Sequence, residues 1–314
     1  TSVDMDIDGG FNFELSGKEY DPFLCGLLGQ SAFTHYGTSG LGTTFSLTTA
    51  ALLLTAAVAP TTTSAFSNLS AGSWIKIVPP VGATSAQKAY FADAWFKVAS
   101  TTTTTIVLDA STPVTGAGLG ITAVAGYAVS QSSIVNGSTF GSFTMEYALT
   151  DIGQFLPFTG MQVGNMDLSL DVGAMVKGSF GFIGQGHNGM TGSTTLPGSP
   201  VASQSLEVMN GVSDLGAIFE NGSSILGATS FIKSMKLSVN NNPRGQKALG
   251  VFGNAGVALG ELAISGTLDV YVEDASYYNK WLNGTNTSLS VGMADAAGNG
   301  YLFDFDKIRF TDGG

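Results

Sequence analysis

The sequence predicts a mainly β protein: a β-sandwich or half-barrel with one flanking α-helix and a long hairpin, plus an inserted small β module. The first observation is a strict alternation of apolar and polar side chains over residues 166–182, because successive side chains of a strand point to opposite faces. The second is a set of shorter alternating stretches, among them 230–242 and 260–274. The third is a charged fraction of only 11%, against about 25% in an ordinary soluble domain.

The low charged fraction indicates what kind of surface the protein contacts. With a mean hydropathy of +0.26, the chain has too little polar surface to coat a free monomer, so it is expected to contact other copies or a membrane. The most apolar run, 47–59, is shorter than the ~20 residues of a membrane-spanning helix. The alternating stretches are also too few and too irregular for an outer-membrane barrel. We therefore expect no membrane insertion and favour contact between copies.

The N-terminal region alternates over residues 4–15 and contains Gly9 and Gly10, which predicts two strands joined by a Gly-Gly turn. Its aspartates match the first half of a calcium-binding EF-hand loop, but Leu15 stands where that loop needs its closing glutamate. We therefore expect no calcium. The next stretch, 19–30, predicts a short apolar helix in which Cys25, the single cysteine, is buried and inert.

Residues 38–133 differ from the rest of the chain, because they are rich in Thr, Ser, Ala and Gly and poor in charge. Short strands separated by turn-rich spacers are expected at 73–78, 94–100, 104–109 and 126–132. The Gly-rich stretch 116–120 lacks the helix and the spacing of a dinucleotide-binding loop, so it predicts an ordinary loop. We expect 38–133 to be an inserted β module, and 1–37 with 134–314 to form the core.

The alternating stretch in the middle of the chain is too long for one ordinary strand, and residues 171–174 contain the Asp and Gly that turns prefer. It predicts a hairpin of two strands, 162–171 and 174–184. The apolar face is expected to pack in the core through Met166, Leu168, Leu170, Val176 and Phe180. The polar face carries Asp167, Ser169, Asp171, Lys177 and Ser179.

The C-terminal region predicts a strand at 230–242, a second at 260–274 broken near Gly266, and a last hairpin with its turn at 296–300. Between them, Asp274 is expected to cap a helix that ends at Gly284. The apolar side of this helix consists of Tyr277, Tyr278, Trp281 and Leu282, and Trp281 is expected to be a buried packing residue. The polar, Gly-rich connection at 186–200 is expected to be mobile.

The sequence has no pattern of catalytic residues. His35 and His187 lie in Gly-rich segments without a matching carboxylate or cysteine, so we expect solvated loop residues and no metal or acid–base role. Glu273 and Asp274 are adjacent on a strand and face opposite ways, which is unsuitable for two-carboxylate glycan hydrolysis. We expect no enzymatic activity, no cofactor and no metal. The net charge of −11 also disfavours binding of nucleic acid through a basic face.

Three blocks of the sequence, 11–29, 141–184 and 260–313, carry a resemblance to a known family and cover a little over a third of the chain. In overall pattern and order they resemble the tail tube proteins, or major tail proteins, of long-tailed bacteriophages. The resemblance implies a β-sandwich or half-barrel with a flanking helix, six copies per ring, and rings stacked into a hollow tube. It also implies a place in the virion tail, assembly in the host cytoplasm, and a tape measure protein and tail-end proteins as partners.

The resemblance suggests a role for the polar face of the hairpin. When a ring closes, hairpins of neighbouring subunits are expected to pair side by side, which leaves no strand edge open. Asp167 and Asp171 then make the bore acidic, partly offset by Lys177, so that DNA passes without specific binding. Two alternatives stay open: the polar face is an ordinary solvated outer surface, or the chain is a virion-decorating or cell-surface binding module.

Overall fold

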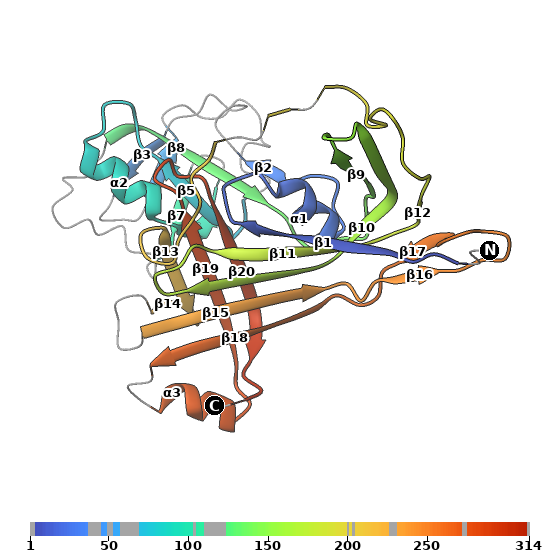
Figure 1. The fold of residues 1–314 in the computed structure, drawn as a ribbon. Helices are drawn as coiled ribbons and strands as arrows, with labels where there is room; N and C mark the ends of the chain where they lie inside the picture. Colours follow the sequence, from blue (N-terminus) through green and yellow to red (C-terminus); the bar gives the residue numbers. More distant parts are fainter. Residues whose placement is uncertain are drawn as a thin grey trace.

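The structure, a computed structural model, describes residues 4–36, 45–48, 53–56, 69–102, 105–109, 124–199, 201–202, 205–225, 231–271 and 275–312. It is built mainly from antiparallel strands, with short helices at its periphery (Figure 1). The predicted mainly β class is confirmed, and the architecture is consistent with a β-sandwich.

The main sheet follows the path β1–β11–β10–β15–β18, and each neighbouring pair on this path is antiparallel. Its strands are β1 (Ile7–Glu14), β10 (Gln154–Asp171), β11 (Lys177–Gly184), β15 (Phe231–Asn240) and β18 (Ala263–Tyr271). Two further strands, β9 (Phe143–Leu149) and β12 (Gly186–His187), pair with the first part of β10. The long strand β10 therefore belongs to the main sheet only in its second part.

The predicted long hairpin is present as β10 and β11, joined by a turn at residues 172–176. Gly173 has a φ of +74° in this turn, a conformation that costs a glycine little. The strand β10 begins at Gln154, earlier than predicted, and a register shift between Val163 and Asn165 separates its two parts.

Two predicted breaks in the main sheet are wrong. The strand β1 continues through Gly9 and Gly10, and β18 continues through Gly266. A Cβ atom on Gly10 would lie 2.5 Å from the carbonyl oxygen of Phe180, and one on Gly266 would lie 2.6 Å from that of Lys236. These glycines allow the backbones of neighbouring strands to approach closely, which is the other common reason for glycine inside a strand.

A second sheet packs on the apolar face of the main sheet and makes the sandwich. Its order is β14 (Ser223–Ser224), β13 (Leu215–Glu220), β19 (Asn286–Ala294) and β20 (Gly300–Arg309), and β19 and β20 form the predicted last hairpin. Ile218, Val291 and Met293 of this sheet share one buried cluster with Leu168 and Phe180 of the main sheet. The helix α1 (Asp21–Leu28) adds Leu24 and Leu27 to the same cluster.

A third sheet follows the path β2–β8–β3–β4–β7–β6–β5, and β5 also pairs with β8. Its elements are β2 (Thr34–Tyr36), β3 (Phe45–Thr48), β4 (Leu53–Ala56), β5 (Trp74–Val78), α2 (Ser85–Asp93), β6 (Phe96–Thr101), β7 (Thr105–Leu108) and β8 (Val124–Ser133). The four predicted short strands correspond to β5, β6, β7 and β8, whereas α2 was not predicted. The predicted loop at 116–120 lies outside the described residues, and the division of the chain at 38–133 stays a prediction.

The third sheet is packed against the second one. Trp74 of β5 forms a buried cluster with Ala217 and Phe219 of β13, flanked by Trp95 and Leu302. Ala217 and Phe219 alternate with Ile218, which faces the main sheet, so the two faces of β13 contact different layers. The molecule therefore has three layers, in which the third sheet lies on the side of the second sheet away from the main sheet.

Two smaller elements flank the main sheet (Figure 1). A ribbon of β16 (Arg244–Gln246) and β17 (Gly256–Ala258) lies between β15 and β18 in the chain and projects beyond the sheet beside the N-terminal segment. Lys247 ties the two together, with its Nζ 2.7 Å from Asp4 and 2.8 Å from Asp6. The helix α3 (Ser276–Leu282) follows β18. Within the part of the chain that the structure describes, no helix is long and apolar enough to cross a membrane.

Candidate functional site: the polar face of the main sheet

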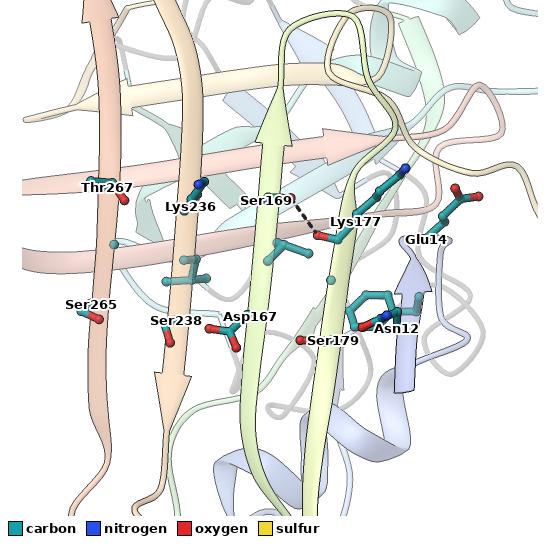
Figure 2. A pocket seen from close by; sticks show the side chains of 15 residues that line it. Asn12, Glu14, Asp167, Ser169, Lys177, Ser179, Lys236, Ser238, Ser265 and Thr267 are labelled. Carbon is teal, nitrogen blue, oxygen red and sulfur yellow. Dashed lines mark hydrogen bonds between the residues drawn. The ribbon is translucent and has the colours of Figure 1, made fainter. Parts of the chain in front are cut away.

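The polar face of the main sheet is a shallow groove of about 910 Å³ that crosses all strands of the β1–β11–β10–β15–β18 path. Figure 2 shows the side chains that point into it. The polar ones are Asn12, Glu14, Asp167, Ser169, Lys177, Ser179, Lys236, Ser238, Ser265 and Thr267.

Strand register arranges these side chains in two rows across the sheet. The first row runs through Glu14, Lys177, Ser169, Lys236 and Thr267. The second row runs through Asn12, Ser179, Asp167, Ser238 and Ser265. Each row is polar from one edge of the sheet to the other, so the hydration of this face is continuous.

Charge on this face is grouped along the strands. Both lysines of the groove, Lys177 and Lys236, belong to the first row, while Asp167 belongs to the second. Beyond the first row, Asp171 of β10 lies level with Ser234 of β15, and Asp269 of β18 follows in the same line. The first row thus contains both lysines together with Glu14 at the β1 edge, and further carboxylates lie on both sides of this row.

The sequence predicted part of this face. Asp167, Ser169, Lys177 and Ser179 line the groove together, whereas Asp171 lies exposed at the end of β10, outside the residues that line it. Sequence reasoning missed the contributions of β1, β15 and β18, namely Asn12, Glu14, Lys236, Ser238, Ser265 and Thr267. The alternation in each strand signals a polar face, but only the strand order shows that these faces join.

The strand β15 lies within the predicted strand 230–242, but its alternation is not regular. A bulge between Ile232 and Ser234 changes the register there, and Lys233 does not follow the buried Met235. Lys233 is exposed, and its Nζ lies 3.9 Å from Asp269 of the neighbouring strand.

The apolar residues of the hairpin lie on the other side of the main sheet. The buried cluster contains Met166, Leu168, Leu170, Val176 and Phe180. Trp281, the other predicted packing residue, differs from them because it is only partly buried and α3 has no buried residue at all. The indole Nε1 of Trp281 donates a hydrogen bond to the carbonyl oxygen of Thr311 at 3.3 Å. The helix cap predicted at Asp274 lies outside the described residues.

The edges of the main sheet correct the predicted way of joining copies. In the described part of the chain, β1 pairs only with β11 and β18 only with β15. The strands β10 and β11 are hydrogen-bonded on both sides within their own chain, so the hairpin has no edge for a neighbour's hairpin. Open backbone donors and acceptors are left at β1 and β18, which are therefore the strands able to pair with another chain.

The connection after the hairpin, which the sequence predicts to be mobile, makes hydrogen bonds with the strand β9. The carboxylate of Glu146 in β9 accepts hydrogen bonds from the Thr194 hydroxyl at 2.6 Å and the Thr195 amide at 2.8 Å. These hydrogen bonds lower the pKa of Glu146, with the Thr194 hydroxyl as the largest cause. His187 likewise lies in the short strand β12, and its Nδ1 accepts a hydrogen bond from the Gly189 amide.

Cys25 and the N-terminal aspartates, the other groups considered from the sequence, have contacts that indicate a structural role. Cys25 is buried in α1, and this burial raises the pKa of its thiol, which keeps the thiol protonated and unreactive. Asp4 and Asp6 bind Lys247, and the hydrogen bond from Lys247 lowers the pKa of Asp4. Among the described residues, no three His, Cys, Asp or Glu side chains are grouped to hold a metal ion.

The main sheet thus has a continuous polar face and an open edge on each side. A family model described as phage tail tube protein matches residues 1–314, so the chain belongs to the phage tail tube family. The predicted family is thereby confirmed, and the protein is a structural component of the virion tail that is assembled in the host cell. A search of curated proteins gave no significant match.

Proposed function

We propose that six copies join edge to edge through their main sheets into a ring, and that stacked rings form a tube whose bore is lined by the polar face. The observation that carries this proposal is that the polar rows extend over every strand of the path and end at open edges on both sides. Closing a sheet on itself through copies satisfies both edges at once.

The direction of the strands defines the joint between copies. The path from β1 to β18 contains four antiparallel steps, so β1 and β18 run in the same direction. Rotation about an axis roughly along the strands keeps that direction and places β18 beside β1 of the next copy as a parallel pair. The third sheet lies on the far side of the sandwich and then faces the outside of the tube.

The charge of the polar face suits the passage of DNA. Carboxylates outnumber lysines on it, with Asp8, Glu14, Asp167, Asp171 and Asp269 against Lys177, Lys236 and the bulged Lys233. A weakly acidic bore repels the phosphate backbone, and DNA moves through without specific binding. The lysines partly offset this repulsion and leave a net charge of −2 on the face of each copy, compared with −1 for the hairpin alone. Other copies, a tape measure protein and tail-end proteins are the partners in this proposal.

Labelling along the tube tests which face lines the bore. Ser238→Cys places a thiol on the polar face. Val81→Cys places one in the turn between β5 and α2, next to the third sheet, where Val81 is 95% exposed; each variant has a Cys25→Ala background. Purified protein is assembled, treated with a biotin maleimide and then with streptavidin, which is too wide to enter the bore. We expect rings or tubes in negative stain, with streptavidin along the walls of the Val81→Cys tubes and not of the Ser238→Cys tubes.

Two results would contradict the proposal. Wild-type protein that stays monomeric at high concentration would show that the open edges do not join copies. Streptavidin along the walls of Ser238→Cys tubes would place the polar face outside.

A further inference from the structure

The helix α3 leaves its apolar side uncovered in the subunit. Tyr278 is 53% and Leu282 61% exposed, and Trp281 between them is only partly buried. An isolated helix of this length is not stable in water, since short helices depend on tertiary contacts. The ring of Tyr277 contacts that of Phe310 at 6.0 Å, but no residue of α3 is buried, so polar contacts are also needed to hold α3 in the subunit.

An ion pair with the second sheet fixes the helix. Lys280 Nζ lies 2.6 Å from an Oε atom of Glu220 and 2.7 Å from the other, and the Glu220 side chain is only 7% exposed. The hydroxyl of Thr287 in β19 also donates a hydrogen bond to Glu220. These polar contacts orient the helix from one side and leave Tyr278 and Leu282 facing outward.

The helix α3 lies next to the open edge of the main sheet. Figure 1 shows α3 beyond β18, on the side of the sheet away from β1. At the end of β18, Tyr271 pairs across the strands with Phe231 of β15, and both are more than half exposed. Tyr271 follows Ser265, Thr267 and Asp269 in the alternation of β18, so this pair lies on the polar face, opposite α3. Exposed apolar side chains therefore flank the open edge on both faces of the sheet, which is typical of a surface that another chain covers.

The order of the strands indicates which surface of the next copy lies beside α3 in the proposed ring. The proposed ring places β18 beside β1 of the next copy, and α1 lies over β1, with the ring of Phe23 5.3 Å from that of Phe11. Both helices are on the apolar side of the main sheet, because α3 is tied to the second sheet and Phe23 also contacts Phe180 and Phe182. The joint therefore brings α3 of one copy towards α1 of the next.

The surface beside α1 has a receiving groove of about 510 Å³. Its apolar lining includes Pro22, Cys25, Phe33 and Phe143. We propose that Tyr278 and Leu282 of α3 insert into this groove of the next copy in the ring and clamp the β18–β1 joint from outside. The proposal rests on the ring described above and adds a second contact to it.

Charge differs between the two sides of the joint. Near the β18 edge, β15 carries Lys233 and Lys236, and Asp269 of β18 offsets one of these two charges. At the opposite edge, β1 carries Asp8 and Glu14. In a chain with a net charge of −11, the more positive β18 side favours the acidic β1 edge of another copy.

Sedimentation velocity of a double variant tests the clamp. Tyr278→Ser with Leu282→Ser removes two large apolar contacts, and we expect the concentration for half-assembly into rings to rise at least about tenfold. The matched control is Val81→Ser with Val201→Ser, which changes two strongly exposed apolar residues elsewhere and is expected to assemble like wild type. Thermal unfolding of the dilute monomer should be unchanged in both variants, because neither α3 residue is buried there.

Cross-linking tests the same contact without weakening it. Leu282→Cys combined with Ser31→Cys, in a Cys25→Ala background, places one thiol on α3 and one at the rim of the groove. Mild oxidation of assembled rings should give a ladder of covalent multimers, whereas each single-cysteine chain should give dimers at most.

The outcomes separate the clamp from the ring itself. Wild-type rings that persist at the same concentration in the Tyr278→Ser/Leu282→Ser variant, with no ladder from the cysteine pair, would overturn the clamp and leave the ring standing. Wild-type protein that forms no rings would overturn the proposed ring, and the clamp with it. A ladder together with weakened assembly supports both.

Discussion

The hairpin β10–β11 and the flank formed by β18 and α3 look alike in sequence and differ in structure. Both regions have alternating or amphipathic sequences. The apolar side of the hairpin is buried in the subunit, whereas much of the apolar surface of the flank stays exposed. Phe180 and Leu168 are 1% and 2% exposed, whereas the strand β18 and the helix α3 contain no buried residue. The difference teaches that amphipathic patterning marks two-faced elements without showing whether the apolar side is covered by the same chain.

The physical cause of the difference is the position in the sheet. The hairpin lies inside the main sheet, beneath the second sheet and α1, so its apolar side chains leave water when the subunit folds. The flank lies at the edge, where its own chain covers it only in part: Leu268 packs against the buried cluster and Tyr277 against Phe310. The exposed apolar side chains Tyr278 and Leu282 can leave water only when a partner covers them, which links this region to assembly and the hairpin to folding.

Among substitutions that test this difference, the largest loss of monomer stability is expected at Phe180. Its ring lies 4.9 Å from that of Phe13 and 5.6 Å from that of Phe23, in the middle of the buried cluster. Phe180→Ala should lower the free energy of unfolding of the monomer by about 3–5 kcal/mol, measured by urea denaturation. The neighbouring Ser179→Ala, on the polar face, should change it by less than about 0.5 kcal/mol. A small loss for Phe180→Ala would mean that the apolar face is not the subunit's core.

An intermediate effect is expected where the flank is anchored. Lys280→Met leaves the buried Glu220 carboxylate with the Thr287 hydroxyl and without its cation, which should cost about 1–3 kcal/mol in the same measurement. Lys307→Met removes an exposed lysine of β20 and is the matched control, with little change expected. Adding Glu220→Gln to Lys280→Met should recover part of the loss. Equal stability of the Lys280 and Lys307 variants would show that the ion pair does not hold α3.

The smallest effect on the monomer is expected at Trp281. A fully packed tryptophan would cost several kcal/mol on truncation, but this one is only partly buried and donates one hydrogen bond, to Thr311. Trp281→Ala should therefore lower monomer stability by no more than about 1 kcal/mol, seen as a small shift of the melting temperature in dilute protein. A loss of stability comparable with that of Phe180→Ala would show that Trp281 is packed in the core of its own subunit. It would contradict the conclusion that the apolar side of α3 is uncovered.

Much of the fold follows from short-range signals in the sequence. Alternation located the hairpin, the strands β15 and β18 and the last hairpin, and it separated Leu168 and Phe180 from Asp167 and Ser179 correctly. The role of a glycine was harder to predict from the sequence. Gly10 and Gly266 permit the close approach of two strands, whereas Gly173 permits a turn, and the residue type alone does not distinguish the two roles. The bulge before Ser234 could not be predicted from the sequence either, because one extra residue shifts the alternation of inward and outward side chains without changing the composition of the strand.

The sequence by itself indicated which elements have two faces, which side chains of the hairpin belong to each face, and the family, because these depend on patterns along the chain. Only the tertiary structure decided that β10 and β11 lie inside the sheet, that β1 and β18 lie at its edges, and that Glu14, Lys177 and Lys236 form one row. Strand order brings together residues more than two hundred positions apart, and local periodicity carries no information about such pairings. The uncovered side of α3 depends on the same long-range order, since burial is set by the elements that lie next to the helix.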